Sequence, residues 1–201
     1  DRELLSTYGK GLIGTTGCPS GEVQVHLRYG NYAEARKVAG EFQEILGRDN
    51  YFLELMDHGL DIERRVRDGL LELARDLRIP LLATNDSHYV DRSDAPSQEH
   101  LLCINSGSTM DIPAGDGPGQ RFAFSGDGYY LKSPAEMRAL WVDRHGLREA
   151  CDNTLLIAER CDVKFSEAVG KYMPKFPCPP GENEDSWLVK EVERGLAARY
   201  P

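Results

Sequence analysis

The sequence of 201 residues predicts an α/β fold that continues into a mainly helical C-terminal segment. Three short apolar runs, at residues 12–17, 51–56 and 81–84, have the composition of buried strands. Segments whose apolar residues recur at helical spacing lie between these runs, and strands that alternate with helices form a mostly parallel sheet or barrel. A proline-rich stretch then precedes one last helical pattern.

The first predicted strand leads into a helix. Cys18 follows the strand, and Pro19 and Ser20 suit the first turn of a helix, which we expect to run to about Tyr29. A second helix is predicted over residues 31–46, and a glycine ends it.

The second and third predicted strands both end in polar residues. Asp57 and His58 follow the strand at 51–56, and Asp61 is placed to cap the next helix, which keeps its apolar spacing to Arg78. Asn85-Asp86-Ser87-His88 follows the strand at 81–84. Because ligands of such folds bind at the carboxyl ends of the strands, the first candidates for a site are Cys18, Asp57, His58, Asp86 and His88.

The second half of the chain is more helical and more irregular. Residues 105–128 are rich in glycine and read as a loop, and residues 128–132 read as a short strand. Helices are predicted over residues 97–104, 133–140, 147–160 and 182–199.

We divide the chain into a domain at residues 1–161, a connector at 162–181 and a final segment at 182–201. The connector contains four prolines between residues 174 and 180, which forbid a helix there. The chain opens in a helical pattern without methionine and closes directly after another. We therefore interpret it as a piece of a longer protein.

Composition limits the possible functions. Lysine and arginine number 24 against 33 aspartate and glutamate, and a net charge of −9 argues against nucleic-acid binding by bulk charge alone. It leaves open a local site where metal ions meet phosphates. No apolar run is long enough to cross a bilayer, and we recognise no signal peptide, so we expect a cytoplasmic location. The five cysteines include no CxxC motif, and we expect them to be reduced thiols.

Asp86 and His88 form the sharpest local motif. Two residues that lie two apart on an extended segment point to the same side. A carboxylate and an imidazole placed together can share a divalent cation. The alternative is that both side chains serve hydrogen bonds within a turn, and the spacing alone favours that alternative.

Cys18, Asp57 and His58 are weaker candidates. A helix N-terminus stabilises a thiolate, which is both a nucleophile and a metal ligand, but a small buried thiol that only packs is the commoner case. Of Asp57 and His58, one could reach a site while the other packs, and a supporting role is favoured. Structural roles without polar partners are expected for the remaining histidines, His26, His100 and His145, and core positions for the cysteines Cys103, Cys151 and Cys161.

Six blocks of sequence, in order, carry a resemblance to a known family. They are GLIGTTGCPSGEVQ, DNYFLELMDHGLDIERRVRDGL, PLLATNDSHYV, HLLCINSGSTM, DGYYLKSPAEM and EACDNTLLIAERC. With these blocks the chain resembles the bacterial replicative C-family DNA polymerases (the DNA polymerase III alpha subunit family), and in particular their actinobacterial members. The resemblance covers nearly the whole chain and is weakest at residues 111–121.

The resemblance implies a fold and a set of metal ligands. Residues 1–161 resemble the C-terminal half of the polymerase and histidinol phosphatase (PHP) domain, part of an irregular β/α barrel with a polynuclear metal cluster at the carboxyl ends of its strands. Its ligands carry over to Cys18, Asp86 and His88, with Asp57 and His58 as supporting candidates. The remaining ligands, including a His-x-His pair, lie upstream in the family. Residues 182–201 resemble the start of the palm and thumb region, whose catalytic aspartates lie further on.

The resemblance also implies a function. It makes the chain part of a DNA-directed DNA polymerase, a nucleotidyltransferase whose PHP domain has a metal-dependent 3′–5′ exonuclease (proofreading) role. Zinc or manganese is expected in the PHP site and magnesium in the polymerase site outside this chain. The implied partners are primer-template DNA, deoxynucleotides, the sliding clamp and other replisome subunits, with no membrane. Two alternatives remain, an inactive PHP domain that braces the polymerase and a stand-alone PHP phosphoesterase. The chain alone is expected to be inactive, without catalytic residues beyond the metal ligands.

Overall fold

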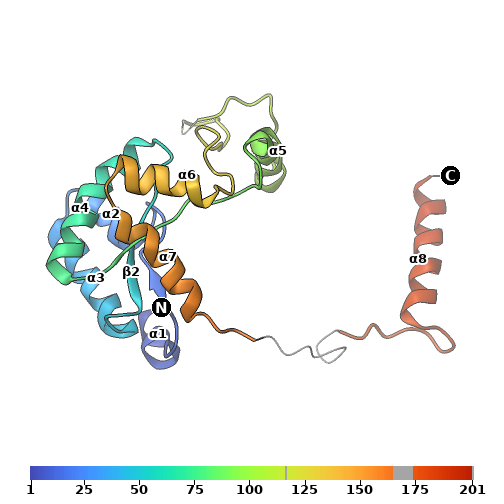
Figure 1. Cartoon of the computed structure of the whole chain (residues 1–201). Coiled ribbons are helices and arrows are strands. Elements are labelled where there is room, and N and C mark those ends of the chain that lie inside the picture. Colours follow the sequence, from blue (N-terminus) through green and yellow to red (C-terminus); the bar gives the residue numbers. More distant parts are fainter. Residues whose placement is uncertain (116, 165–173, 201) are drawn as a thin grey trace. The chain divides into compact units, whose positions relative to one another are not determined.

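The computed structural model describes residues 1–115, 117–164 and 174–200. It divides into two compact units, Asp1–Cys161 and Asp162–Pro201. The first unit combines a small sheet with helices, and the second contains a helix, as Figure 1 shows. The predicted α/β class is confirmed. A search of the described helices finds none that is long and apolar enough to cross a membrane.

The sheet has three parallel strands in the order β1 (Gly14–Thr15), β2 (Tyr51–Leu55) and β3 (Leu81–Ala83). Gly14 pairs with Tyr51, and Leu53 pairs with Leu81. The three predicted strands are confirmed, each slightly shorter than expected. Because the strands are parallel, the residues that follow them emerge at the same edge of the sheet.

The fourth predicted strand, at residues 128–132, is wrong. Tyr130 forms only an isolated bridge with Tyr89. The side chain of Asn85 donates hydrogen bonds to the carbonyl oxygens of Gly128 and Tyr130, where a strand would receive them from a neighbouring backbone. Backbone hydrogen bonds also join it to residues 88–90, among them that of the His88 N–H to the Tyr129 carbonyl oxygen at 2.7 Å, but they do not continue into a regular ladder.

Helices of the first unit lie around the sheet, except α5, which lies apart from it and packs on the turn η1 (Figure 1). They are α1 (Arg2–Tyr8), α2 (Glu22–Arg28), α3 (Tyr32–Leu46), α4 (Asp61–Leu77), α5 (Ala95–Ser106), α6 (Pro134–Arg138) and α7 (Arg148–Arg160), with a 3-10 turn η1 (Arg92–Asp94) and a π-helix η2 (Ala139–Arg144). The predicted helices are confirmed, with α5 longer than expected. The π-helix was not predicted, and its Trp141 is completely buried.

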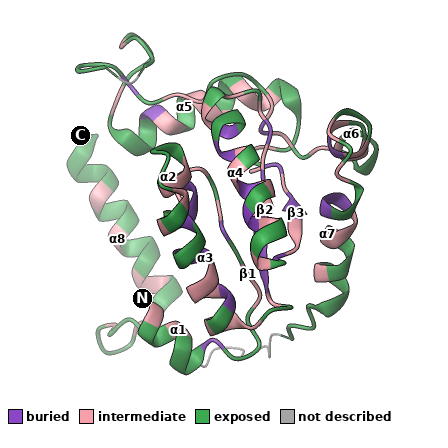
Figure 2. Ribbon diagram, turned by 90° about the vertical axis from the view of Figure 1, so that its left-hand side faces the viewer, coloured by how far each residue is buried: buried purple, intermediate pink, exposed green. Residues whose placement is uncertain are grey.

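The core lies around β2, whose side chains are buried on both faces of the sheet (Figure 2). A continuous apolar strand is typical of the centre of a parallel sheet. Helix α4 packs its buried apolar face against β2, and α7 packs along β3. The buried apolar residues that these helices contribute are Val66, Leu70, Leu73, Ala150 and Cys151.

The turn after β1 differs from the prediction. Helix α2 begins at Glu22 with Gly21 as its N-cap, and the Gly21 N–H donates to the Cys18 carbonyl oxygen at 2.8 Å. Gly17 has φ +71°, a left-handed conformation that favours glycine and turns the chain away from the strand before any helix begins. Cys18 therefore lies in the turn that precedes α2, outside the first turn of the helix.

The second unit contains α8 (Glu184–Arg199), as predicted within two residues. The Asn183 side chain accepts a hydrogen bond from the Ser186 N–H at 2.9 Å and so defines the start of the helix. Residues 174–178 are without regular structure, in agreement with their prolines. Part of the predicted connector, residues 165–173, lies outside the described residues.

Candidate functional site

A cavity of about 820 Å³ lies where the carboxyl ends of the strands emerge, and we name it the strand-end cavity. Of the predicted site residues, Cys18, His58 and Asp86 line it. They come from the three segments that follow β1, β2 and β3. The cavity is also lined by Arg28, Glu63, Arg65, Phe122, Phe124 and Tyr129.

Asp86 and His88 lie together, although not for the reason that the sequence suggested. Asp86 has φ +46°, a left-handed conformation that aspartate tolerates better than most residues, so the segment is not extended. His88 Nε2 nevertheless lies 3.4 Å from Asp86 Oδ1. The His88 ring also contacts Phe124, with ring centroids 4.5 Å apart, which places it beside the cavity that Phe124 lines.

Asn85 anchors the segment that carries these two residues. Its side-chain nitrogen donates to the Tyr130 carbonyl oxygen at 2.7 Å, and its side-chain oxygen accepts from Lys132 Nζ at 2.6 Å. Burial lowers the pKa of Lys132 from its usual value. Sequence analysis missed Asn85 and Lys132 as supports, because the contact joins residues 47 positions apart.

His58 is held in one orientation by two partners. Its Nδ1 lies 2.6 Å from Glu63 Oε1, and its Nε2 lies 2.7 Å from the Asn85 carbonyl oxygen. A carbonyl only accepts, so Nε2 carries a proton, and the contact between Nδ1 and a carboxylate needs a second one. Burial lowers the pKa of His58, but the hydrogen bonds from Glu63 and Asn85 outweigh it and raise the pKa above its usual value. Both ring nitrogens of His58 are therefore engaged, one by Glu63 and one by the Asn85 carbonyl oxygen, and neither is left to bind a metal in this arrangement.

Asp57 lies away from the strand-end cavity in a second buried cluster. His145 Nε2 lies 2.6 Å from Asp57 Oδ2, and Arg67 lies 3.1 Å from the same oxygen. The expectation that His145 has no polar partner is therefore wrong, because the π-helix brings it to Asp57 from 88 residues further along the chain. Asp57 thus makes structural contacts in this cluster, and its supporting role for a metal site stays a prediction.

The Asp57 cluster predicts acid sensitivity. Burial raises the pKa of Asp57, but hydrogen bonds from His145 and Gly59 and the charge of Arg67 outweigh it, so the pKa is lower than usual. Stability from this carboxylate is present above the unfolded pKa of about 4 and is lost as pH falls through the lower folded value. We expect Asp57→Asn to be less stable at pH 7 and to lose less stability than wild type between pH 5 and pH 2. Urea unfolding across this range measures it, and parallel pH profiles would contradict it.

The predicted cysteines fall into two groups. Cys18 is exposed, so the alternative of a buried packing thiol is wrong for it. Cys103 and Cys151 are buried as expected. Cys161 is exposed, contrary to the prediction, because it is the C-cap of α7 and lies beyond the last packed turn.

The described residues by themselves do not complete a metal site. Within residues 1–115, 117–164 and 174–200, no group of three or more His, Cys, Asp or Glu side chains could hold a metal ion. What the fold brings together is a contact between Asp86 and His88, and a cavity shared by Asp86 and Cys18. Such a partial donor set needs further ligands before it can fix a cation.

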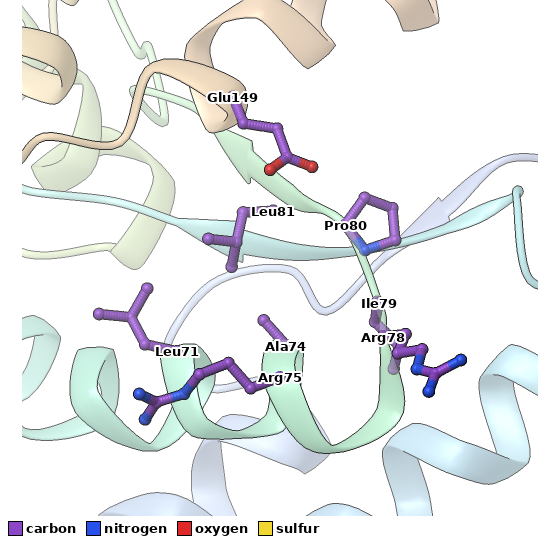
Figure 3. Close-up of a pocket in the computed structure, with 8 residues that line it drawn as sticks. All are labelled: Leu71, Ala74, Arg75, Arg78, Ile79, Pro80, Leu81 and Glu149. Carbon is purple, nitrogen blue, oxygen red and sulfur yellow. The ribbon is translucent and has the colours of Figure 1, made fainter.

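A second hollow, of about 530 Å³, lies at the opposite end of β3 (Figure 3). Helix α4 contributes Arg75, and Glu149 of α7 lies across from it. Its apolar floor includes Pro80 and Leu81, the residues at the start of β3. With Glu149 as its one potential ligand, it offers no comparable chemistry.

The chain is similar to known proteins over its whole length. A family model described as the PHP domain matches residues 1–58. The whole chain is similar to DNA polymerase III subunit alpha of Mycobacterium tuberculosis (54% identity), Saccharopolyspora erythraea (50%) and Thermus aquaticus (36%). In each case the match covers 100% of this chain and 16% of the relative. The chain thus spans about a sixth of the length of these relatives, and over its whole length it is similar to a segment of bacterial DNA polymerase III alpha subunits that includes part of a PHP domain.

Proposed function

We propose that this chain is part of a replicative DNA polymerase and contributes to a metal-dependent 3′–5′ exonuclease centre in its PHP domain. Cys18, Asp86 and His88 supply part of the ligand set, and ligands outside this chain complete it. Zinc or manganese held by these residues would supply Lewis-acid activation of the phosphodiester and of the attacking water. Asn85 and Lys132 hold Asp86 and His88 in position.

The observation that carries the proposal is the shared strand-end cavity. The segments that follow β1 and β3 bring Cys18 and Asp86 to the same cavity, and His88 lies 3.4 Å from Asp86. A thiolate, a carboxylate and an imidazole are the donors that zinc and related metals take in proteins. His58 is engaged by Glu63, and Asp61 by Arg64, which leaves Cys18 and Asp86 of the cavity lining, with His88 beside them, as the proposed ligands.

One observation favours a second candidate function. Since no three potential ligands meet within the part of the chain that the structure describes, an inactive PHP domain that braces the polymerase also fits. A stand-alone phosphoesterase fits less well, because the similarity to the alpha subunits extends through the second unit to the end of the chain. The polymerase function itself, with primer-template DNA, deoxynucleotides, magnesium and the sliding clamp, lies with residues outside this chain.

A comparison of two purified proteins tests the proposal. We expect the full-length subunit that contains this chain to remove a mismatched 3′ nucleotide in a chelator-sensitive reaction. The 201-residue chain alone binds metal weakly and shows no nuclease activity, because three donors do not fix a polynuclear cluster. Metal-dependent exonuclease activity of the isolated chain would overturn the claim that ligands are missing. If the metal-loaded full-length subunit showed no exonuclease activity, the bracing function would be favoured.

A further inference from the structure

Two arginines of the strand-end cavity have side chains without a counter-charge. Arg28 is the last residue of α2, Arg65 lies in the second turn of α4, and both line the cavity. Among the described residues, neither guanidinium has a hydrogen bond or an ion pair within 4.0 Å. Two positive charges therefore face a cavity with their donors unused.

The carboxylates of the same cavity do not neutralise these arginines. Asp61 pairs with Arg64, which lies outward on α4, and Glu63 pairs with the buried His58. Asp86 lies against His88. Asp61 and Glu63 already have partners, and Asp86 is a metal ligand in the proposed function, so both guanidinium groups stay available to an anionic ligand, in a chain whose net charge is −9.

An aromatic wall, which we define as Phe122, Phe124 and Tyr129, forms another side of the cavity. The ring centroids of Phe122 and Phe124 are 5.4 Å apart, and those of Phe124 and Tyr129 are 4.6 Å apart. Tyr129 is buried, whereas Phe122 at the outer end of the wall is 57% exposed. The aromatic wall therefore exposes the ring of Phe122 to a ligand that enters the cavity.

We propose that the strand-end cavity binds the 3′ end of a single DNA strand, with Arg28 and Arg65 on backbone phosphates and Phe122 stacked on a terminal base. Guanidinium groups bind phosphates with charge-assisted hydrogen bonds, and exposed aromatic rings stack on bases without regard to sequence. A volume of about 820 Å³ is of the size that nucleotide-sized ligands occupy. This inference rests on the proposed exonuclease function and assigns it three substrate-positioning residues. A small phosphate ester without a base or a second phosphate would use the metal ligands only.

Kinetics on the full-length subunit tests the arginines. We expect Arg28→Gln and Arg65→Gln each to raise KM for a single-stranded oligonucleotide about tenfold, with kcat within about twofold of wild type. The double variant should reduce the slope of log(kcat/KM) against log salt by about 1.4, because about 0.7 is expected per phosphate contact on a single strand. Hydrolysis of bis(4-nitrophenyl) phosphate, which has neither base nor neighbouring phosphate, should stay unchanged.

Arg75→Gln is the matched control, since it removes an arginine of the same helix α4 that lines the hollow at the other end of β3. Equal KM values in the cavity variants and Arg75→Gln would overturn the role of the arginines.

A photocrosslink separates this inference from the exonuclease proposal. An oligonucleotide with 5-iodouracil at its 3′ terminus should crosslink to Phe122, and the double arginine variant should lose that crosslink. A crosslink at Phe122 without hydrolysis would support the binding site and refute the exonuclease proposal. Hydrolysis with crosslinks confined to other regions would refute the binding site and keep the exonuclease. Neither hydrolysis nor a crosslink would refute both.

Discussion

Glu63→Ala is expected to lower the free energy of unfolding of the chain by about 3–5 kcal/mol, because it leaves a buried imidazolium without its partner. Glu63 is 3% exposed, and the His58 side chain is 1% exposed. The Glu63 carboxylate also accepts hydrogen bonds from the backbone N–H groups of His58 and Leu60, at 2.7 and 3.2 Å. The substitution removes all three contacts at once, and urea unfolding at pH 6 measures the loss.

The pH dependence of this effect distinguishes an ion pair from simple packing. Because the folded pKa of His58 is raised, its contribution is fully present below the unfolded value of about 6.5 and is lost as pH rises through the folded value. The stability difference between wild type and Glu63→Ala should therefore shrink at alkaline pH. Glu72→Ala, an exposed glutamate on the same helix, is the control and should stay within about 0.5 kcal/mol of wild type. A Glu63 effect equal to that control would contradict the buried pair.

His88→Ala is expected to reduce exonuclease activity of the full-length subunit by at least about 100-fold. Removing the imidazole deprives the metal centre of a donor and leaves Asp86 without the partner 3.4 Å away. Folding should be nearly unaffected, because the His88 side chain is 34% exposed. Release of a mismatched 3′ nucleotide measures the loss, and primer extension by the same preparation shows that the polymerase site is intact.

His100→Ala provides the matched control for His88. His100 is an exposed histidine on α5 whose ring contacts only the Pro96 carbonyl oxygen of its own helix. Its replacement should leave hydrolysis within about twofold of wild type. Hydrolysis by His88→Ala at the rate of His100→Ala would refute the role of His88 as a ligand.

The elements that the sequence predicted well are those with a strong local pattern. The apolar run of β2 and the helical spacing of α3, α4 and α7 each specify an element without help from distant residues, and the structure confirms them. The predicted start of the helix after Cys18 was wrong for a local reason. Proline and serine at 19 and 20 are compatible with a helix, but the left-handed Gly17 and the cap at Gly21 delay its start to Glu22.

The parts of the site that sequence analysis missed depend on contacts between distant segments. Glu63 is an exception, because it lies only five residues from His58, but its place at a helix start does not reveal that the two side chains lie 2.6 Å apart. Lys132 reaches Asn85, and His145 reaches Asp57, only after the chain has folded. Strand ends could be predicted as the place of a site, whereas the residues that orient its side chains could not.

The central claim is that Cys18, Asp86 and His88 serve one metal centre, and metal content tests it most directly. We expect Cys18→Ser in the full-length subunit to bind less metal per chain than wild type, measured by plasma mass spectrometry after gel filtration, with unfolding unchanged. Cys161→Ser is the matched control, since Cys161 is also an exposed thiol but lies at the end of α7. It should retain the metal content of wild type, and metal-loaded wild type should resist alkylation at Cys18 until chelator is added. Metal content in Cys18→Ser equal to that of Cys161→Ser would contradict the account.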